Sequence, residues 1–290
     1  MPGSPLHRPI LDWFAAHART LPWREPDAGG WAVLVSEVML QQTPVARVLP
    51  VYSAWMDRWP TSAALAREAS GEAVRMWGRL GYPRRALRLH QAAVVIEADY
   101  DGAVPSSYDE LLRLPGVGDY TAAAVSSFAF GHRELVLDTN VRRVLGRILR
   151  GQESPPQALT RAERVDAAQV LPDDPATAAT WSVAVMELGA LVCQARSPRC
   201  GACPVRDRCA WRLAGHPAYA GPPRRGQTYA GTDRQCRGRI LAILRDLDEP
   251  LPRPDLEVVW ADVAQRERAL ASLVHDGLVV VGDEGSLALP

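Results

Sequence analysis

Apolar residues recur at helical spacing through the first 215 positions of the chain. Ile10, Leu11, Trp13 and Phe14 form one apolar face within residues 9–19, and Pro9 occupies a position that helices favour at their start. The same spacing predicts further helices over residues 33–40, 62–77, 85–98, 120–130, 141–149 and 176–192. Glycine- and proline-rich turns separate these stretches, and strand-type alternation is missing from them. The pattern predicts an all-α region over residues 1–215.

The remainder of the chain shows a different pattern. Residues 216–234 are rich in Pro, Gly, Ala and Arg, which is typical of a linker. Helical spacing returns over residues 238–247 and 263–275, and two short apolar stretches around a Gly-Asp-Glu-Gly turn predict a terminal hairpin. Helices followed by a hairpin resemble a winged helix, so residues 235–290 are expected to form a small α/β winged-helix-like unit.

Composition limits the chemistry. The chain has 290 residues, of which 47% are hydrophobic and 23% charged, and all 33 basic residues are Arg. The lack of Lys excludes a lysine Schiff base and a phosphate-loop lysine. No apolar run is long enough to span a bilayer, and residues 1–8 lack a signal-peptide core. We therefore expect a soluble cytoplasmic protein without membrane contact.

Charge is unevenly distributed, although the formal net charge is zero. Residues 193–239 hold ten Arg against two acidic residues, whereas residues 240–290 hold four Arg against ten acidic residues. Because phosphate neutralisation supplies much of the affinity for DNA, the acidic tail favours packing or protein contact over DNA binding for the C-terminal unit.

Four cysteines lie within seventeen residues, in the pattern Cys-x6-Cys-x2-Cys-x5-Cys that begins at Cys193 and continues with Cys200, Cys203 and Cys209. Four thiolates in a short loop are the ligand set of a 4Fe–4S cluster. A structural zinc site is the alternative, and it is less favoured because only one pair has the tight spacing of zinc ribbons. Cys236 falls outside this spacing and is interpreted as a spare thiol. Five Arg residues between and after the ligands could face phosphates or form an ordinary solvated surface.

Residues 114–122 read Leu-Pro-Gly-Val-Gly-Asp-Tyr-Thr-Ala and open a predicted helix. Gly116 and Gly118 leave space for backbone N–H groups at a helix start to approach an anion. The segment fits a helix–hairpin–helix that holds a DNA phosphate, in preference to a plain helix–helix turn.

Two carboxylates occur in unusual settings. Glu37 interrupts an apolar helical stretch, where a carboxylate is costly unless paired or protonated; a raised pKa would suit a general acid. A solvent-facing position on a half-buried helix is the alternative. Asp138 ends an apolar run before a helix, so it could be an N-cap or a functional carboxylate.

Taken together, these features resemble the endonuclease III superfamily of DNA glycosylases, and within it the MutY-type adenine DNA glycosylases. The matching segments fall within residues 10–212 and are 21–24, 36–43, 80–82, 114–122, 137–141 and 186–193. The resemblance implies a two-module helix–hairpin–helix glycosylase fold over residues 1–215. Residues 31–131 would form a six-helix barrel, and residues 1–30 and 132–215 a module that carries the 4Fe–4S cluster.

The resemblance also implies roles for single residues. Glu37 matches the proton donor, Asp138 the carboxylate that stabilises the transition state, and Asn140 a residue that orients this part of the site. Positions that bind DNA around an extruded base or line the adenine pocket are matched by Gln41, Gln42, Tyr82, Arg19, Trp23, Arg24, Tyr120 and Glu187. Tyr120 stands where strand-cutting relatives carry Lys, so base removal without strand cleavage is expected.

The implied reaction is hydrolysis of the N-glycosidic bond of adenine opposite 8-oxoguanine or guanine in double-stranded DNA, by a monomer that associates with the bacterial nucleoid. The chain departs from the family at Thr139, where Gly is frequent, and at Pro83, where Tyr is common. The 56 residues after the linker are too few for the Nudix-like domain that reads 8-oxoguanine in longer members. A glycosylase for oxidised pyrimidines and a non-enzymatic iron–sulfur DNA sensor are the rival hypotheses.

Overall fold

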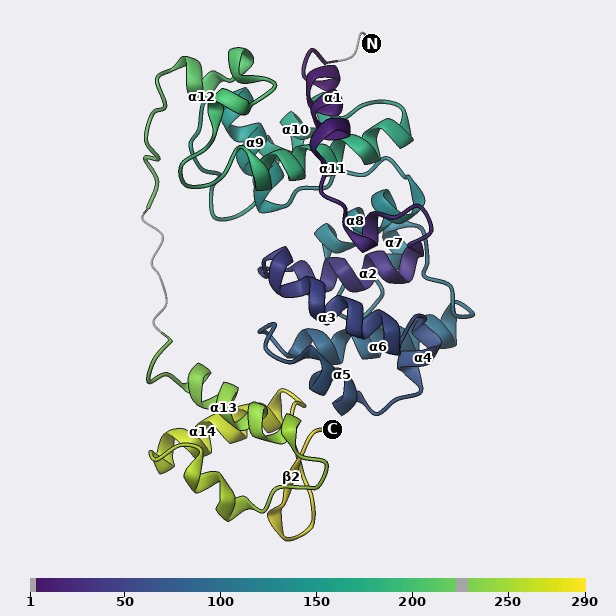
Figure 1. Cartoon of the computed structure of the whole chain (residues 1–290), viewed down its shortest axis with the longest axis vertical. Helices are drawn as coiled ribbons and strands as arrows, with labels where there is room; N and C mark the ends of the chain where they lie inside the picture. The colour runs from purple at the N-terminus through teal and green to yellow at the C-terminus, as the bar shows by residue number, and fades with distance from the viewer. Residues whose placement is uncertain (1–3, 223–228) are drawn as a thin grey trace. The chain divides into compact units, whose positions relative to one another are not determined.

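The computed structural model describes residues 4–222 and 229–290. Residues 223–228 of the predicted linker lie outside the described part. The prediction of a mostly helical fold is confirmed (Figure 1), and none of the described helices is long and apolar enough to cross a bilayer. The elements of residues 1–222 are α1 (His7–His17), η1 (Pro22–Arg24), α2 (Gly29–Leu40), α3 (Val45–Arg58), α4 (Ser62–Ala66), α5 (Ser70–Trp77), α6 (Arg84–Asp99), α7 (Tyr108–Leu111), α8 (Asp119–Phe130), α9 (Thr139–Arg150), α10 (Arg161–Val170), α11 (Pro175–Leu191), η2 (Cys200–Ala202), η3 (Arg206–Arg208) and α12 (Ala210–Leu213).

Residue contacts divide the chain into two compact units. Unit 1 comprises Met1–Val33, Ser106–Leu112 and Val117–Pro223, and unit 2 comprises Leu34–Pro105, Arg113–Gly116 and Arg224–Pro290.

Helices α1, α9 and α11 form the core of unit 1. Side-chain caps mark the starts of α9 and α11: the Asp138 side chain caps α9, and the Asp174 side chain caps α11 directly before Pro175. The two helices approach closely at Gly189, where an added Cβ would lie 2.7 Å from the Cβ of Asn140. This close approach brings the start of α9 against the end of α11.

A second core lies in unit 2, where helices α3, α4, α5 and α6 pack together. Trp55, Trp59 and Trp77 are almost completely buried there. The Trp55 ring meets Trp59 edge-on at 4.7 Å and Trp77 edge-on at 5.9 Å between ring centroids. Aromatic rings prefer this geometry. The Trp77 Nε1–H also donates to the Gly81 carbonyl oxygen at 2.9 Å, which links the cluster to the turn that follows α5.

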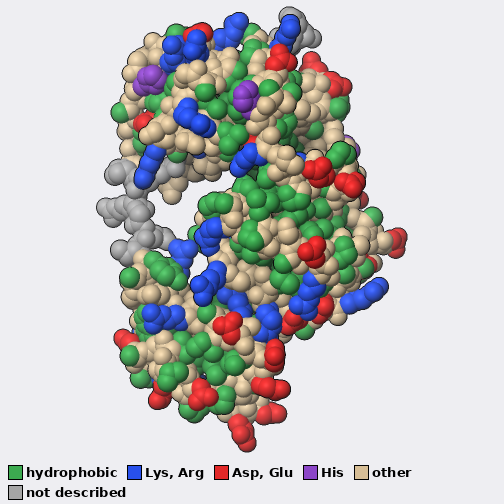
Figure 2. Space-filling model, viewed as in Figure 1, with side chains coloured by type: hydrophobic (Ala, Val, Ile, Leu, Met, Phe, Trp, Pro, Cys, Tyr) green, Lys and Arg blue, Asp and Glu red, His purple; other side chains and the backbone are tan. Residues whose placement is uncertain are grey.

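The C-terminal unit, defined here as residues 229–290, has the two helices and the terminal hairpin that its pattern predicts, and two 3-10 helices that were not predicted. They are α13 (Asp233–Asp246), η4 (Arg253–Val258), α14 (Val263–His275), β1 (Val280–Val281), η5 (Asp283–Gly285) and β2 (Leu287–Ala288). The two strands pair antiparallel, with Val281 opposite Leu287, and Leu251 adds a single bridge to Leu287. Figure 2 shows acidic side chains spread over the end of this unit, at the bottom of the view.

The helix prediction needs correction in three places. The helix predicted over residues 62–77 is two helices, because the chain turns after α4 and the Glu68 carbonyl oxygen in that turn bonds to the His90 ring at 2.8 Å. Helix α3 was not predicted, and it contains Pro50, a residue that normally argues against a helix interior. Helix α10 was also missed, although Thr160 and Glu163 form a capping box at its start.

The close approach at Gly189 predicts a position-specific stability effect. Gly189→Ala should lower the free energy of unfolding by about 1–3 kcal/mol, because its methyl group meets a packed side chain on α9. Gly146→Ala is the matched control on α9, since an added Cβ there has nothing within 4 Å, and it should be neutral or stabilising by up to about 1 kcal/mol. Urea unfolding of both variants measures the difference, and equal effects would contradict this account of the packing.

Candidate active site and cysteine cluster

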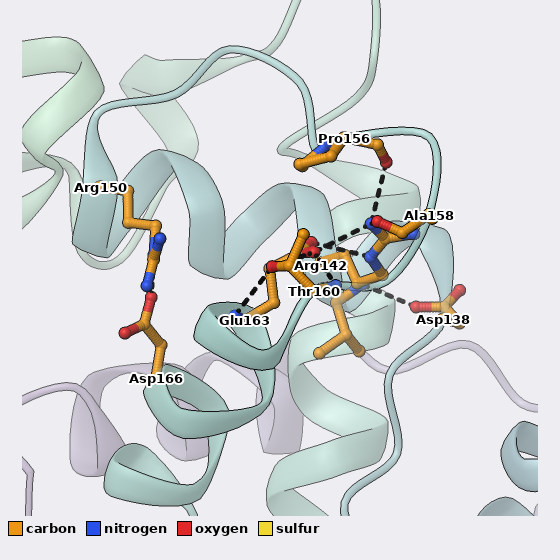
Figure 3. Close-up of polar contacts among 9 residues, drawn as sticks. Asp138, Arg142, Arg150, Pro156, Ala158, Thr160, Glu163 and Asp166 are labelled. Atoms are coloured by element: carbon orange, nitrogen blue, oxygen red, sulfur yellow. Dashed lines mark hydrogen bonds and ion pairs between the residues drawn. The ribbon is translucent and has the colours of Figure 1, made fainter.

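Asp138 lies at the start of α9 in unit 1 (Figure 3). Its Oδ1 accepts a hydrogen bond from the Val141 backbone N–H at 2.6 Å, and its Oδ2 accepts one from the Asn140 side-chain amide at 2.7 Å. Asp138 is therefore an N-cap, which was one of the two interpretations of its sequence position. The capping role leaves the carboxylate oriented by two donors at a helix N-terminus, where negative charge is stabilised.

Burial dominates the electrostatics of this carboxyl group. Desolvation raises the pKa of Asp138 above its ordinary value of 3.8, against the hydrogen bonds from Val141 and Asn140 and the charge of Arg143. Ionisation of this half-buried carboxyl group is therefore costly, and a cation placed beside it would offset that cost.

A chain of hydrogen bonds leads from Asp138 to the first cysteine of the cluster pattern. Asn140 donates to Asp138 and accepts at 2.8 Å from the Arg143 guanidinium, which also donates to the carbonyl oxygens of Gly189 and Cys193, both at 2.8 Å. Arg143 is only 6% exposed. The position of the cysteine loop is thereby linked to the orientation of the Asp138 carboxylate.

The four cysteines of the sequence pattern line one cavity in unit 1. Arg147, which is buried, holds the loop that begins at Cys193. It donates to the carbonyl oxygens of Glu153 and Gln194 at 2.8 Å, approaches the Cys193 Sγ at 3.4 Å and stacks on the Trp211 ring at 4.5 Å.

This cavity fits an iron–sulfur cluster. Its donor set is four sulfur atoms, and the rest of its lining is mainly apolar side chains and guanidinium groups. Burial raises the pKa of the Cys203 thiol to about 11 and also raises that of Cys193. Bound iron would supply the positive charge that favours the thiolate forms.

Glu187 is a buried carboxylate of unit 1, and its two oxygens together accept hydrogen bonds from Arg19 and Arg24. Its Oε1 accepts from the Arg19 backbone N–H at 3.1 Å and the Arg19 Nε at 2.7 Å, and its Oε2 accepts from Arg19 Nη2 at 2.7 Å and Arg24 Nη2 at 2.9 Å. Burial alone would raise the pKa of Glu187, but these contacts lower it to about 2. The buried Trp23 lies beside Arg24 in η1. Four residues predicted to line the adenine pocket thus lie close together in unit 1, because Glu187 holds the segment 19–24 that contains the other three.

Two further predictions concern the helix–hairpin–helix. Helices α7 and α8 pack together, and Tyr120 lies in the first turn of α8 against a small apolar cluster with Ala123, Ala124 and Val136. Gly116 has φ +82°, and an added Cβ would lie 2.7 Å from the Arg88 Cβ, so a side chain is excluded there. Gly118 is exposed directly before α8 with open space beside it, which suits the approach of an anion to the helix start.

In unit 2, Glu37 lies on α2 and is 5% exposed. The alternative of a solvent-facing glutamate is therefore wrong. Residues Gln41 and Gln42 follow directly after the end of α2, and Gln42 has φ +55° at an exposed turn.

Arg85 joins this segment to the turn at Tyr82. Its guanidinium donates to the carbonyl oxygens of Val38 at 2.8 Å, Gln41 at 2.6 Å and Gly81 at 3.1 Å, and its charge lies 5.5 Å from the centre of the Tyr82 ring. Burial lowers the pKa of Arg85 to about 10, so the group stays charged near neutral pH. One buried cation thus fixes the segment after Glu37 and the turn that presents Tyr82.

The buried arginines Arg85, Arg143 and Arg147 were not found by sequence reasoning. Arg143 and Arg147 are spaced four residues apart on α9 among Val144 and Ile148, and this spacing on an apolar face is the signal that could have revealed them.

Comparison with known proteins agrees with these features. Residues 35–168 match the HhH-GPD superfamily of base excision DNA repair proteins, and residues 193–209 match the iron–sulfur binding domain of endonuclease III. The chain is 51% identical to the adenine DNA glycosylase of Mycobacterium tuberculosis, over 97% of this chain and 92% of that protein. It is 53% identical to the adenine DNA glycosylase of Mycolicibacterium smegmatis, over 97% of this chain and 94% of that protein. The chain belongs to the adenine DNA glycosylase family.

More distant relatives share a smaller part of the chain. The human adenine DNA glycosylase is 41% identical over 69% of this chain and 38% of that protein. A thermostable thymine-DNA glycosylase structure aligns with a TM-score of 0.63 and 25% identity, covering 71% of this chain and 94% of the other. Endonuclease III in a non-covalent complex with DNA aligns with a TM-score of 0.60 at 23% identity, covering 72% of this chain and 97% of the other, which supports the fold alone. The predicted family, the helix–hairpin–helix glycosylase fold and the iron–sulfur cofactor are confirmed.

The shared cavity predicts which thiols hold the cluster. Cys203→Ser should abolish iron binding or reduce it severely, because a hydroxyl is a poor substitute for a thiolate ligand, and the visible absorption of the cluster should be lost with it. Cys236→Ala is the control, since Cys236 lies in the C-terminal unit and should leave iron content unchanged. Metal analysis of both purified variants provides the measurement, and bound zinc without iron in the parent chain would contradict the cluster assignment.

The lowered pKa of Glu187 predicts a dependence of stability on acid. Its ionised form stabilises the folded chain fully above its ordinary pKa of 4.5, and this contribution is lost as the pH falls towards about 2. Glu187→Gln should cost roughly 2–3 kcal/mol at neutral pH, below the usual cost for a fully buried pair because Arg19 and Arg24 are partly exposed. The free energy of unfolding, measured with urea between pH 5 and pH 3, should fall less steeply with decreasing pH in the variant than in the parent chain. Parallel slopes would exclude this role for Glu187.

Proposed function

We propose that this chain hydrolyses the N-glycosidic bond of adenine in duplex DNA where the adenine stands opposite 8-oxoguanine or guanine. The observation that carries the proposal is the Asp138 carboxylate, which is desolvated yet oriented by Val141 and Asn140 at the start of α9. This carboxylate occurs in a chain at least 51% identical to two mycobacterial proteins named adenine DNA glycosylase. The preference for 8-oxoguanine rests on the family resemblance.

Glu37 acts in this proposal as the proton donor. Adenine is a poor leaving group until a ring nitrogen is protonated, and a carboxyl group on a buried helix position can supply that proton. When the bond between the sugar carbon and the base nitrogen breaks, the electron pair leaves with the protonated base.

Asp138 then stabilises the positive charge that develops on the deoxyribose. An oxocarbenium-like transition state is typical of glycosidic cleavage, and a fixed anion in a site of low dielectric stabilises it strongly. Water forms the new bond to the sugar carbon and gives its proton to Glu37 or Asp138, so the products are free adenine and an abasic site. Asn140 keeps the Asp138 carboxylate in position through its 2.7 Å hydrogen bond.

The reaction ends at base removal. Strand cleavage by this superfamily uses a lysine amine, and all 33 basic residues of this chain are Arg. Tyr120 occupies the corresponding position on α8 and packs against an apolar cluster. The abasic product should therefore stay intact until alkali is added.

The target adenine must leave the base stack before either carboxylate can reach it. We assign the contacts that hold the duplex around the extruded base to Gln41, Gln42 and Tyr82, and phosphate contact to the backbone at Gly116 and Gly118. Arg19, Trp23 and Arg24 line the adenine pocket, while Glu187 fixes the two arginines in place. The substrate places the enzyme with chromosomal DNA in the bacterial cytoplasm, and one copy of the chain supplies every residue named.

Variants at the two carboxylates test the mechanism. Glu37→Gln and Asp138→Asn should each lower the single-turnover rate of adenine release by about 100-fold or more, because one removes the proton donor and the other removes the anion. Asn is also a good N-cap, and Asp138→Asn eliminates a desolvated charge, so its unfolding midpoint should be unchanged or higher.

Two controls accompany these variants. Asp174→Asn changes an exposed N-cap of α11, and Glu257→Gln changes an exposed side chain of η4; both should retain full activity. Retained activity in a folded Glu37→Gln protein would remove Glu37 from its role. A substrate panel decides between the hypotheses: release of oxidised pyrimidines in preference to adenine, or DNA binding without any base release, would contradict the proposal.

A further inference from the structure

The C-terminal unit packs against α5 and α6, which belong with it to unit 2. Each of the helices α5 and α13 contributes one arginine that hydrogen-bonds to the backbone of the other. Arg75 donates to the carbonyl oxygens of Leu244, Arg245 and Leu247 at the C-terminal end of α13, and Arg245 donates to the Val74 carbonyl oxygen of α5 at 3.0 Å. Cations bind well at helix C-termini, where unpaired carbonyl groups gather. Burial lowers the pKa of Arg245 to about 10, which is typical of a cation enclosed by an interface.

Two more contacts fix the same interface. Asp276, at the end of α14, pairs with Arg84 of α6 at 3.2 Å and with Arg237 of α13 at 2.6 Å. The Gly71 N–H donates to the Pro290 carbonyl oxygen, and an added Cβ at Gly71 would clash with that oxygen. These polar and steric contacts thus fix the position of the C-terminal unit against α5 and α6, the helices that flank Tyr82.

In this position of the C-terminal unit, Arg234 lies against the Tyr82 ring. The Arg234 guanidinium, in the first turn of α13, lies 5.2 Å from the centre of the Tyr82 ring, and Arg85 lies 5.5 Å from it. Tyr82 has φ +49°, a conformation that few residues other than glycine adopt, and its side chain is 48% exposed. An exposed ring on a strained turn keeps one orientation only when its neighbours restrict it, and here two guanidinium groups do so.

We propose that Arg234 is a positioning residue, through which the C-terminal unit holds the Tyr82 ring in the orientation that grips the mispaired duplex. The proposal rests on the assignment of Tyr82 as a DNA-contacting residue under the proposed function. It gives the C-terminal unit a part in mispair recognition that requires no DNA contact of its own, in agreement with its acidic surface. A cation beside an aromatic face provides the attraction that orients the ring.

A double-mutant cycle tests this inference on the full-length protein. Dissociation constants and single-turnover rates are measured for the parent chain, Arg234→Ala, Tyr82→Ala and the double variant, with duplexes that carry adenine opposite 8-oxoguanine or opposite guanine. Arg234→Ala should reduce the rate divided by the dissociation constant about two- to five-fold, the size expected for an exposed cation–aromatic contact. In the Tyr82→Ala background the same change should cause no further loss, because Arg234 acts through the ring.

Arg268→Ala is the matched control. It removes another exposed arginine of the C-terminal unit, one that pairs with Asp233 at 3.5 Å, and should leave both constants unchanged. A direct phosphate contact by Arg234 would predict a different outcome: an equal loss of affinity for undamaged duplex that persists in the Tyr82→Ala background. That result, or an Arg234→Ala protein equal to the parent, would overturn the inference.

Thermal unfolding of each variant separates a loss of orientation from a loss of folding. If Arg234→Ala lowers the unfolding midpoint as much as Gly71→Ala does, the contact is structural and the positioning role is wrong. The parent chain tests the proposed function independently, since absence of adenine release from every duplex would refute that function whatever the Arg234 variant does.

Discussion

Buried guanidinium groups that donate to backbone carbonyl oxygens hold the functional segments of this glycosylase in place. Arg85 joins the end of α2 to the Tyr82 turn, Arg143 joins the start of α9 to the end of α11 and to Cys193, and Arg147 holds the cysteine loop. A buried cation is costly unless several acceptors surround it, so each arginine forces those carbonyl groups to converge. Its planar fork of donors satisfies several loop carbonyls at once, which the ammonium group of lysine does less well.

The same constraint links the cofactor loop to the proposed chemistry. Arg143 contacts both the Cys193 carbonyl oxygen and Asn140, and Asn140 orients Asp138. A cluster bound by the loop would therefore stiffen one end of this hydrogen-bond chain while the carboxylate occupies the other. In the proposed mechanism the cluster would contribute rigidity, and the two carboxylates would perform the acid–base and electrostatic work.

Asp138 makes two opposing contributions to the stability of the folded chain. Capping α9 stabilises the helix, whereas desolvation of the charge raises the carboxyl pKa and costs folding free energy near neutral pH. Asn could supply the cap without that cost, so the charge itself is the feature with a functional explanation.

The sequence predicted those features that are encoded locally. The cap at Asp138, the Gly116 turn and the cysteine spacing each depend on a few neighbouring residues, and these elements agree with the structure. Features decided by distant contacts were missed. Helix α3, which contains Pro50, was not predicted, although tertiary packing stabilises it. Arg85 could not be distinguished from a surface arginine without its partners, whereas the spacing of Arg143 and Arg147 on the apolar face of α9 was a local signal that went unused. The contact of Arg234 with Tyr82 joins residues 152 positions apart, so no local pattern could indicate it.

A crystal structure of the Glu37→Gln protein bound to a duplex with adenine opposite 8-oxoguanine would show whether Glu37 and Asp138 act on one nucleotide, as proposed. The proposed mechanism requires an adenine turned out of the stack, with the side chain at position 37 within hydrogen-bond distance of a ring nitrogen and the Asp138 carboxylate beside the attached deoxyribose. A complex in which these two side chains lie on separate surfaces, with the adenine still paired in the duplex, would contradict it.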